Sequence, residues 1–91
     1  MIQLVIDGAS VENRAALHAL LAEGLPLPDY YGRNLDALYD CLTDPLPEPV
    51  EITLRDFGAL AAALGLYAHK FAAVLARAAR ENQNLRFRMD I

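Results

Sequence analysis

The middle of the chain contains the stretch LPDYYGRNLDALYDCLT, residues 27–43, which predicts a loop followed by a short helix. Pro28 and Gly32 interrupt regular structure in the loop, and glycine at position 32 permits a backbone angle that other residues resist. Asn34 is a suitable helix N-cap, because its side-chain oxygen accepts a hydrogen bond from a free N–H of the first turn. The stretch therefore predicts a helix that begins directly after Asn34.

The predicted helix has an apolar face and a polar face. Helical spacing places on the apolar face Leu35, Leu38 and Leu42. The polar face carries Asp36, Tyr39, Asp40 and Thr43. The two aspartates, one helical turn apart, repel each other by about 0.2–0.5 kcal/mol, and Asp40 also lies near the negative end of the helix dipole. Two interpretations of Asp36 and Asp40 remain open. They are ordinary solvated acids on the surface, or they belong to a site that uses both carboxylates.

Residues 27–43 resemble, nearly residue for residue, the signature of the barstar family of intracellular inhibitors of small secreted bacterial ribonucleases. The rest of the chain is similar in length and in the order of its elements. The resemblance implies that Asp40 takes the place of an RNA phosphate and accepts hydrogen bonds from basic groups in the ribonuclease cleft. It also implies that Asp36 engages a second basic group and that Tyr30 points outward and stacks beside a histidine of the ribonuclease.

The resemblance assigns supporting roles to four further residues of this stretch. Tyr39 and Thr43 line the rim of the same helix, while Gly32 and Asn34 shape the loop so that the helix and Tyr30 are presented together. The residues alone leave open which of the two adjacent tyrosines points outward, and Asn34 is expected to act as a cap.

Three positions depart from the family pattern. Tyr39 stands where barstar has a tryptophan, and Asp44-Pro45 replaces a glycine–tryptophan pair. Arg77 falls near a contacting glutamate on the last helix, which reverses a charge at the edge of the interface. An arginine there opposes a basic partner and disfavours its binding. We infer that the partner differs from barnase and is a related ribonuclease with an acidic rim, or another cationic toxin.

Length and composition predict one folded domain over residues 1–91, with 55% hydrophobic and 22% charged residues. Cys41 is the only cysteine, so no internal disulfide can form, which fits a reducing compartment. The first seven residues lack the basic and apolar regions of a signal peptide. No apolar run approaches the ~20 residues of a membrane span. We expect a cytoplasmic protein.

The charge is unevenly distributed along the chain. Residues 1–50 contain eight Asp or Glu and two Arg, whereas residues 51–91 contain four Asp or Glu and six Lys or Arg. The acidic first half argues against direct binding of nucleic acid, which requires clustered basic residues. The same field attracts a basic partner.

The remaining pattern predicts three strands and four helices. The strands are expected at residues 1–6, 50–55 and 85–91, where apolar and polar residues alternate or β-forming residues gather. Helices are expected from a Ser10 cap to Glu23, with Gly24 as the C′ residue, then after Asn34, from an Asp56 cap to Leu64, and over residues 67–81. Intervening helices imply parallel strands joined by right-handed crossovers. The predicted fold is an α/β, two-layer, three-stranded parallel sheet with about four helices, which agrees with the barstar resemblance.

Two isolated residues carry weaker signals. His18 lies beside the apolar stripe of its helix and is expected to be a surface or boundary residue, because no partner stands at metal-ligand spacing. Cys41 is expected to be a small buried or boundary hydrophobe and not a reactive thiol.

The sequence allows three classes of function to be compared, namely an enzyme, a ribonuclease inhibitor and a regulatory binding module. An enzyme that used Asp36 and Asp40 as an acid–base pair lacks a nearby His, Ser or Cys and a phosphate-binding glycine loop. A Mg²⁺ site would need a third carboxylate, such as Asp29 or Asp44. We therefore expect a ribonuclease inhibitor with no catalytic residue, metal or cofactor. The alternative is a barstar-fold regulatory or immunity-type module that binds a different cationic partner.

Overall fold

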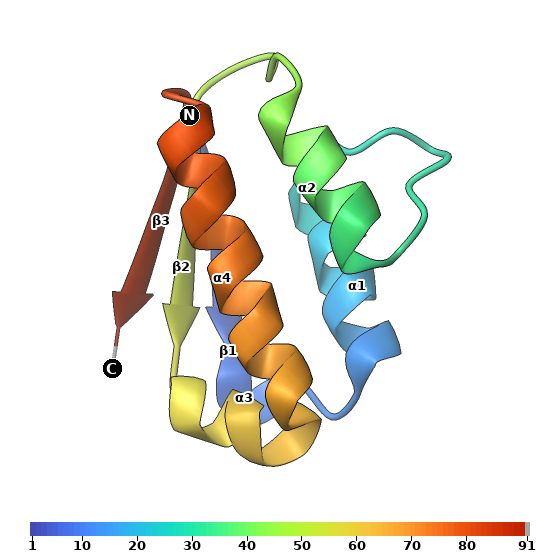
Figure 1. Cartoon of the computed structure of the whole chain (residues 1–91), viewed down its shortest axis with the longest axis vertical. Helices are drawn as coiled ribbons and strands as arrows, with labels where there is room; N and C mark the ends of the chain where they lie inside the picture. The colour runs from blue at the N-terminus through green and yellow to red at the C-terminus, as the bar shows by residue number, and fades with distance from the viewer. Residues whose placement is uncertain (91) are drawn as a thin grey trace.

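The computed structural model describes residues 1–90, in which three parallel strands form one sheet (Figure 1). The strands lie in the order β1 (Ile2–Asp7), β2 (Val50–Arg55) and β3 (Leu85–Asp90). Ile2 pairs with Val50, which pairs with Leu85, and the register continues without a bulge. This confirms the predicted sheet, and β2 has the predicted bounds. Ile91, which the sequence pattern places in the last strand, lies outside the described residues.

Four α-helices and one short 3₁₀-helix connect the strands. They are η1 (Gly8–Ser10), α1 (Arg14–Gly24), α2 (Leu35–Thr43), α3 (Phe57–Leu64) and α4 (Leu66–Glu81). Figure 1 shows that α1, α2 and α4 all run upward in the view, while the strands run downward. All three helix N-termini therefore face the same end of the molecule.

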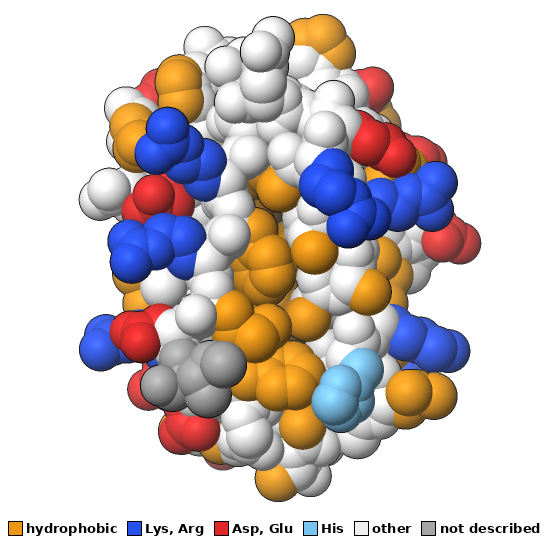
Figure 2. Space-filling model, turned by 60° about the vertical axis from the view of Figure 1, so that its left-hand side comes forward, with side chains coloured by type: hydrophobic (Ala, Val, Ile, Leu, Met, Phe, Trp, Pro, Cys, Tyr) orange, Lys and Arg blue, Asp and Glu red, His pale blue; other side chains and the backbone are white. Residues whose placement is uncertain are grey.

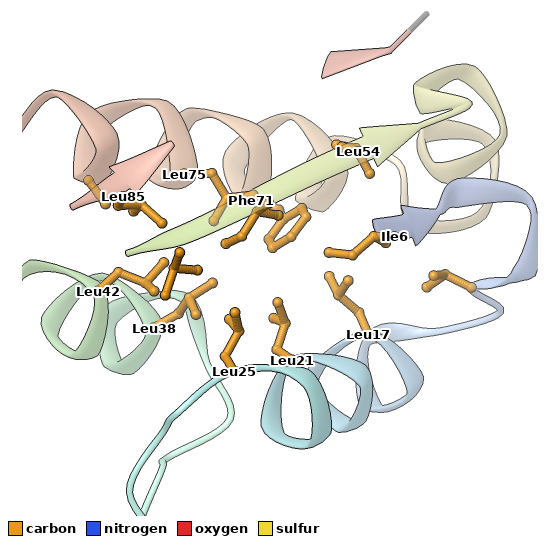
Figure 3. Packing of buried hydrophobic residues seen from close by; sticks show 14 of the residues in the cluster. Ile6, Leu17, Leu21, Leu25, Leu38, Leu42, Leu54, Phe71, Leu75 and Leu85 are labelled. Carbon is orange, nitrogen blue, oxygen red and sulfur yellow. The ribbon is translucent and has the colours of Figure 1, made fainter. Parts of the chain in front are cut away.

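The helices cover one face of the sheet and leave the other face open to solvent. Along β2, Val50, Ile52 and Leu54 are buried, whereas the alternate residues are half-buried or exposed. The core-facing side chains of the strands meet leucines of α1 and α2 and Phe71 and Leu75 of α4 (Figure 3). The result is the predicted two-layer arrangement, with one continuous core between the sheet and the helices.

The start of α1 differs from the prediction. Asn13 caps this helix, and its Oδ1 accepts a 2.8 Å hydrogen bond from the N–H of Ala16. Ser10 ends η1 instead, and its hydroxyl donates to the carbonyl of Asp7. The predicted Ser10 cap is wrong because the chain first makes a tight turn closed by Asp7, which also accepts from the N–H of Ala9.

Two glycines lie where close packing disfavours a side chain. Gly24 is the last residue of α1 and has no positive φ, so its predicted role as a left-handed C′ residue is wrong. A Cβ at position 24 would lie 2.5 Å from a methyl group of Leu4 on β1. Gly8 faces the backbone carbonyls of Arg55 and Asp56, where a Cβ would collide with main-chain atoms. These positions let the turns at both ends of α1 approach the sheet.

Five of the six basic residues of the second half lie on the outer surfaces of α4 and β3, and the sixth, Arg55, ends β2. Lys70, Arg77 and Arg80 of α4 are exposed, as predicted, and so are Arg86 and Arg88 of β3. Figure 2 shows this side of the molecule, with Lys and Arg side chains on both flanks of a strip of apolar side chains. Within residues 1–90, no helix has the length and apolarity that crossing a membrane requires.

Candidate partner-binding site

Helix α2 is held firmly with its acidic face outward. Asn34 caps the helix as predicted, with its Oδ1 accepting a 2.8 Å hydrogen bond from the N–H of Ala37. Leu38 and Leu42 are completely buried against the rest of the core. Because these residues fix the rotation of the helix, Asp36 and Asp40 are exposed on the opposite side. Neither carboxylate forms an ion pair with any other residue in the range 1–90.

The loop before α2 separates the two adjacent tyrosines. Tyr30 is 87% exposed, whereas Tyr31 is 8% exposed and belongs to the core. The N–H of Tyr31 donates to the carbonyl of Pro28 at 3.0 Å, which tightens the loop. The expectation that Tyr30 points outward is confirmed, and its buried neighbour anchors it to the molecule.

Tyr31 is anchored by a buried histidine. The Nδ1 atom of His18 lies 2.5 Å from the hydroxyl of Tyr31, and its Nε2 atom lies 2.6 Å from the hydroxyl of Tyr67 on α4. His18 is only 2% exposed, so the prediction of a surface or boundary residue is wrong. Its two partners are 13 and 49 residues away in the chain, so no local pattern reveals them.

The surroundings of His18 favour its neutral form. Burial lowers the pKa of His18, and the nearby guanidinium of Arg33 lowers it further. In a neutral ring one nitrogen donates and the other accepts, so the ring can satisfy both tyrosine hydroxyls. Burial also raises the pKa of Tyr67, against the opposing effect of Arg14. A neutral His18 therefore joins α1, the loop and α4.

The backbone of the loop differs from the prediction at one position. Gly32 does not have a positive φ, whereas Arg33 does, with φ of 53°. A Cβ at position 32 would lie 3.2 Å from the Cβ of Ala37 and 3.4 Å from the side-chain nitrogen of Asn34. Gly32 is thus favoured by tight packing against the first turn of α2, and the left-handed turn is made by its neighbour.

Tyr39 joins α2 to α4 through a charged cluster. Its hydroxyl donates to Glu81, and the guanidinium of Arg77 lies 4.9 Å from the centre of its ring. Arg77 also pairs with Glu81 at 3.3 Å, one turn along α4. The hydrogen bond from Tyr39 is the largest influence that lowers the pKa of Glu81, and Arg77 lowers it further against the opposing effect of burial. Arg77, which the sequence places at the interface edge, is thus partly neutralised by its own molecule.

Two other residues of α2 have mainly structural contacts. The hydroxyl of Thr43 lies 2.8 Å from the carbonyl of Tyr39 and donates within the helix, so its hydrogen is already engaged. Cys41 is half-buried, as expected for a boundary residue. Burial is the largest influence that raises the pKa of its thiol, followed by the charges of Asp44 and Asp40.

Two surface hollows border the outer face of α2, and each is lined by several of the predicted residues. A hollow of about 420 Å³ is lined by Tyr30, Gly32 and Asp40, which come from the loop and the helix. A second hollow, of about 460 Å³, is lined by Asp36, Asp40 and the α4 residue Arg77. Within the part of the chain that the structure describes, no group of three His, Cys, Asp or Glu side chains is placed to hold a metal ion.

The fold and this site define a class of small two-layer α/β proteins that present acidic side chains on a short helix beside an exposed tyrosine. The family described as Barstar (barnase inhibitor) matches residues 1–91, and the chain belongs to the barstar family. It is 43% identical over 81 residues to the "Putative ribonuclease inhibitor YrdF" of Bacillus subtilis (strain 168). That match covers 89% of this chain and 89% of the relative.

Proposed function

We propose that this chain acts in the cytoplasm as an inhibitor of a small basic ribonuclease of the extracellular type. It would block the active site with the loop and helix that carry Tyr30, Asp36 and Asp40. The family and the name of its relative support a ribonuclease as the partner. On this proposal the chain is a binding protein and performs no catalysis of its own.

The observation that carries the proposal is the state of the two carboxylates. Asp36 and Asp40 are exposed on one face of α2, and within residues 1–90 no cation of the molecule itself pairs with them. Two fixed carboxylates can accept charge-assisted hydrogen bonds from the Arg, Lys and His side chains that bind RNA phosphates. We assign the phosphate-like role to Asp40 and contact with a second basic group to Asp36.

The surrounding residues would act by holding this arrangement in place. Asn34 and Gly32 fix the start of α2, and the contact of His18 with Tyr31 fixes the loop beside Tyr30. Tyr30 would stack on the ribonuclease, while Tyr39 and Thr43 would line the rim. Because these elements are already ordered, binding loses little conformational entropy.

Barnase is the first probe, because the family description names it, and related small basic ribonucleases are tested beside it because we expect the partner to differ from barnase. Calorimetry and an RNA-cleavage assay would compare the wild type with Asp40→Asn, which keeps the shape of the side chain and removes its charge. Loss of one partner from a buried, charged hydrogen bond costs about 2–5 kcal/mol, a general range that also draws on measurements of the barnase–barstar complex itself. We expect Asp40→Asn to weaken binding by roughly 30-fold to several thousand-fold.

Asp90→Asn is the matched control. Asp90 is exposed on the open face of the sheet, and it forms only a surface pair with Arg55 at 3.6 Å. This variant loses the same charge, so it reports the general electrostatic effect alone. Equal affinities of the Asp40 and Asp90 variants for a ribonuclease that the wild type inhibits would refute the proposed site.

A second function is favoured by the cluster around Arg77. This cation borders the hollow that Asp36 and Asp40 share, where it would oppose the basic rim of a barnase-like ribonuclease. A module adapted to a different cationic toxin would bind through the same helix without inhibiting a ribonuclease. Capture of partners from native extract and medium, followed by a cleavage assay on each, would distinguish the two functions.

A further inference from the structure

A third hollow lies at the end of the molecule where α1, α2 and α4 begin. It measures about 670 Å³, and its charged lining residues are Arg14, Arg33, Lys70 and Asp36. The three cations come from α1, the loop and α4, so the fold gathers them from distant parts of the sequence. One carboxylate against three cations gives this hollow a positive character, in a protein whose net charge is −4.

The clustering of cations at this hollow contrasts with the scarcity of basic residues in the first half of the chain. The first 50 residues contain only two basic residues, Arg14 and Arg33, and both line this hollow. Lys70 is brought in from α4. The acidic half of the chain therefore places both of its arginines at this hollow.

The cations are available to a ligand. In the described range 1–90, the ion pairs involve Met1, Arg55 and Arg77 as the positive groups, and none of the three cations of the hollow. Arg14 is held by the ring of Tyr67, with its guanidinium carbon 4.2 Å from the ring centre. The backbone of Arg33 makes the left-handed turn immediately before the cap of α2. One of the three charges, that of Arg14, is thus oriented before any partner binds.

The hollow is continuous with the proposed binding face. Asp36 lines both this hollow and the neighbouring one that contains Asp40. A partner that covers α2 would also cover the edge of this hollow. The carboxylate of Asp36 and the negative net charge oppose a polyanion such as RNA, whereas a single carboxylate can sit among the three cations.

We propose that this hollow receives an acidic side chain from the rim of the bound ribonuclease. The proposal rests on the proposed function and specifies the partner further, as a ribonuclease that carries an Asp or Glu beside its basic cleft. Arginine suits this task, because its guanidinium binds a carboxylate through two parallel hydrogen bonds. The carboxylates of α2 would then pair with basic groups of the ribonuclease, and the cations of the adjacent hollow would pair with one of its acidic groups.

The test uses the ribonuclease that the wild-type chain inhibits, and it compares two double variants with equal loss of charge. Arg33→Gln with Lys70→Gln alters the hollow, and Arg86→Gln with Arg88→Gln alters the exposed outer face of β3. We expect dissociation of the first variant to be faster by roughly tenfold or more. Replacing one rim Asp or Glu of the ribonuclease by its amide should abolish the difference between the two variants.

The outcomes separate the two proposals. If Asp40→Asn does not weaken binding, or if no ribonuclease is inhibited, the proposed function fails and this inference fails with it. If Asp40→Asn weakens binding but the two double variants dissociate at the same rate, only this inference is overturned. It is also overturned if inorganic phosphate, titrated into the free chain and followed by NMR at Arg33 and Asn34, saturates the hollow and leaves ribonuclease binding unaffected by the Arg33 and Lys70 changes.

Discussion

Lowering the pH from 8 to 5 should destabilise this protein through the buried ring of His18. The ring lies between the hydroxyls of Tyr31 and Tyr67, at 2.5 and 2.6 Å from its two nitrogens. A protonated ring has two donors and no acceptor. One tyrosine hydroxyl would then lose its acceptor, and the new charge would face Arg33, Arg14 and Lys70 around the adjacent hollow.

The direction of the effect follows from the lowered pKa of His18 in the folded state. In the unfolded chain the pKa of the histidine is about 6.5, so the ring is protonated below this pH. In the folded chain the ring is protonated only at lower pH. The stabilising effect is therefore complete well above pH 6.5 and is lost as the pH falls below that value toward the folded pKa. Because the folded and unfolded states differ by at most one bound proton at His18, the free energy of unfolding should fall by at most about 1.4 kcal/mol per pH unit.

The assay is urea denaturation at several pH values between 8 and 5. His18→Gln provides the comparison, because its amide cannot be protonated in this range. At pH 8 this variant should be less stable by about 1–3 kcal/mol, since one buried tyrosine hydroxyl is left without a partner. Its stability should then change less between pH 7 and pH 5 than that of the wild type.

His69→Gln is the matched control. His69 is exposed, and its ring meets that of Phe57 in an edge-to-face arrangement with ring centres 5.1 Å apart. This variant should retain the pH dependence of the wild type. The reasoning would be refuted if His18→Gln kept the full pH dependence, or if NMR showed the ring of His18 titrating near 6.5 in the folded protein.

Two further predictions concern the backbone. Asn34→Ala should lower the free energy of unfolding by about 0.5–2 kcal/mol through loss of the α2 cap. Asn34→Asp should keep most of the wild-type stability, because aspartate also caps helices. Equal losses of stability in the two variants, measured by urea denaturation, would contradict the capping role. Gly8→Ala should destabilise by about 1–3 kcal/mol, because its Cβ meets the carbonyl of Asp56. Gly58→Ala, inside α3 with no atom within 4 Å of the new Cβ, should stabilise by up to about 1 kcal/mol. Changes of the same sign in these two glycine variants, measured by thermal unfolding, would count against the packing argument.

Local signals predicted the elements well. Strand β2 has the predicted bounds because apolar and polar residues alternate along it, and α2 begins after Asn34 because the cap and the leucine spacing agree. The outward face of Asp36 and Asp40 follows from the same spacing. The binding roles of these aspartates stay predictions until a partner is tested.

The errors arose where distant residues determine the result. His18 is buried because Tyr31 and Tyr67 approach it from other elements, which its own helix pattern does not show. Gly24 depends on a methyl group of Leu4 in the first strand. The basic hollow is also assembled from three separate segments, so sequence order conceals it. Periodicity predicts which face of an element is buried, but it does not identify the side chains of other elements that contact this face.

The left-handed turn at Arg33 also bears on how this protein would be engineered. A residue with a Cβ at φ of 53° is strained by about 1–3 kcal/mol, which glycine would avoid. A designer who seeks heat resistance would choose glycine at position 33, whereas one who seeks target discrimination would keep the guanidinium. Thermal robustness and selectivity thus make opposite demands on a single position.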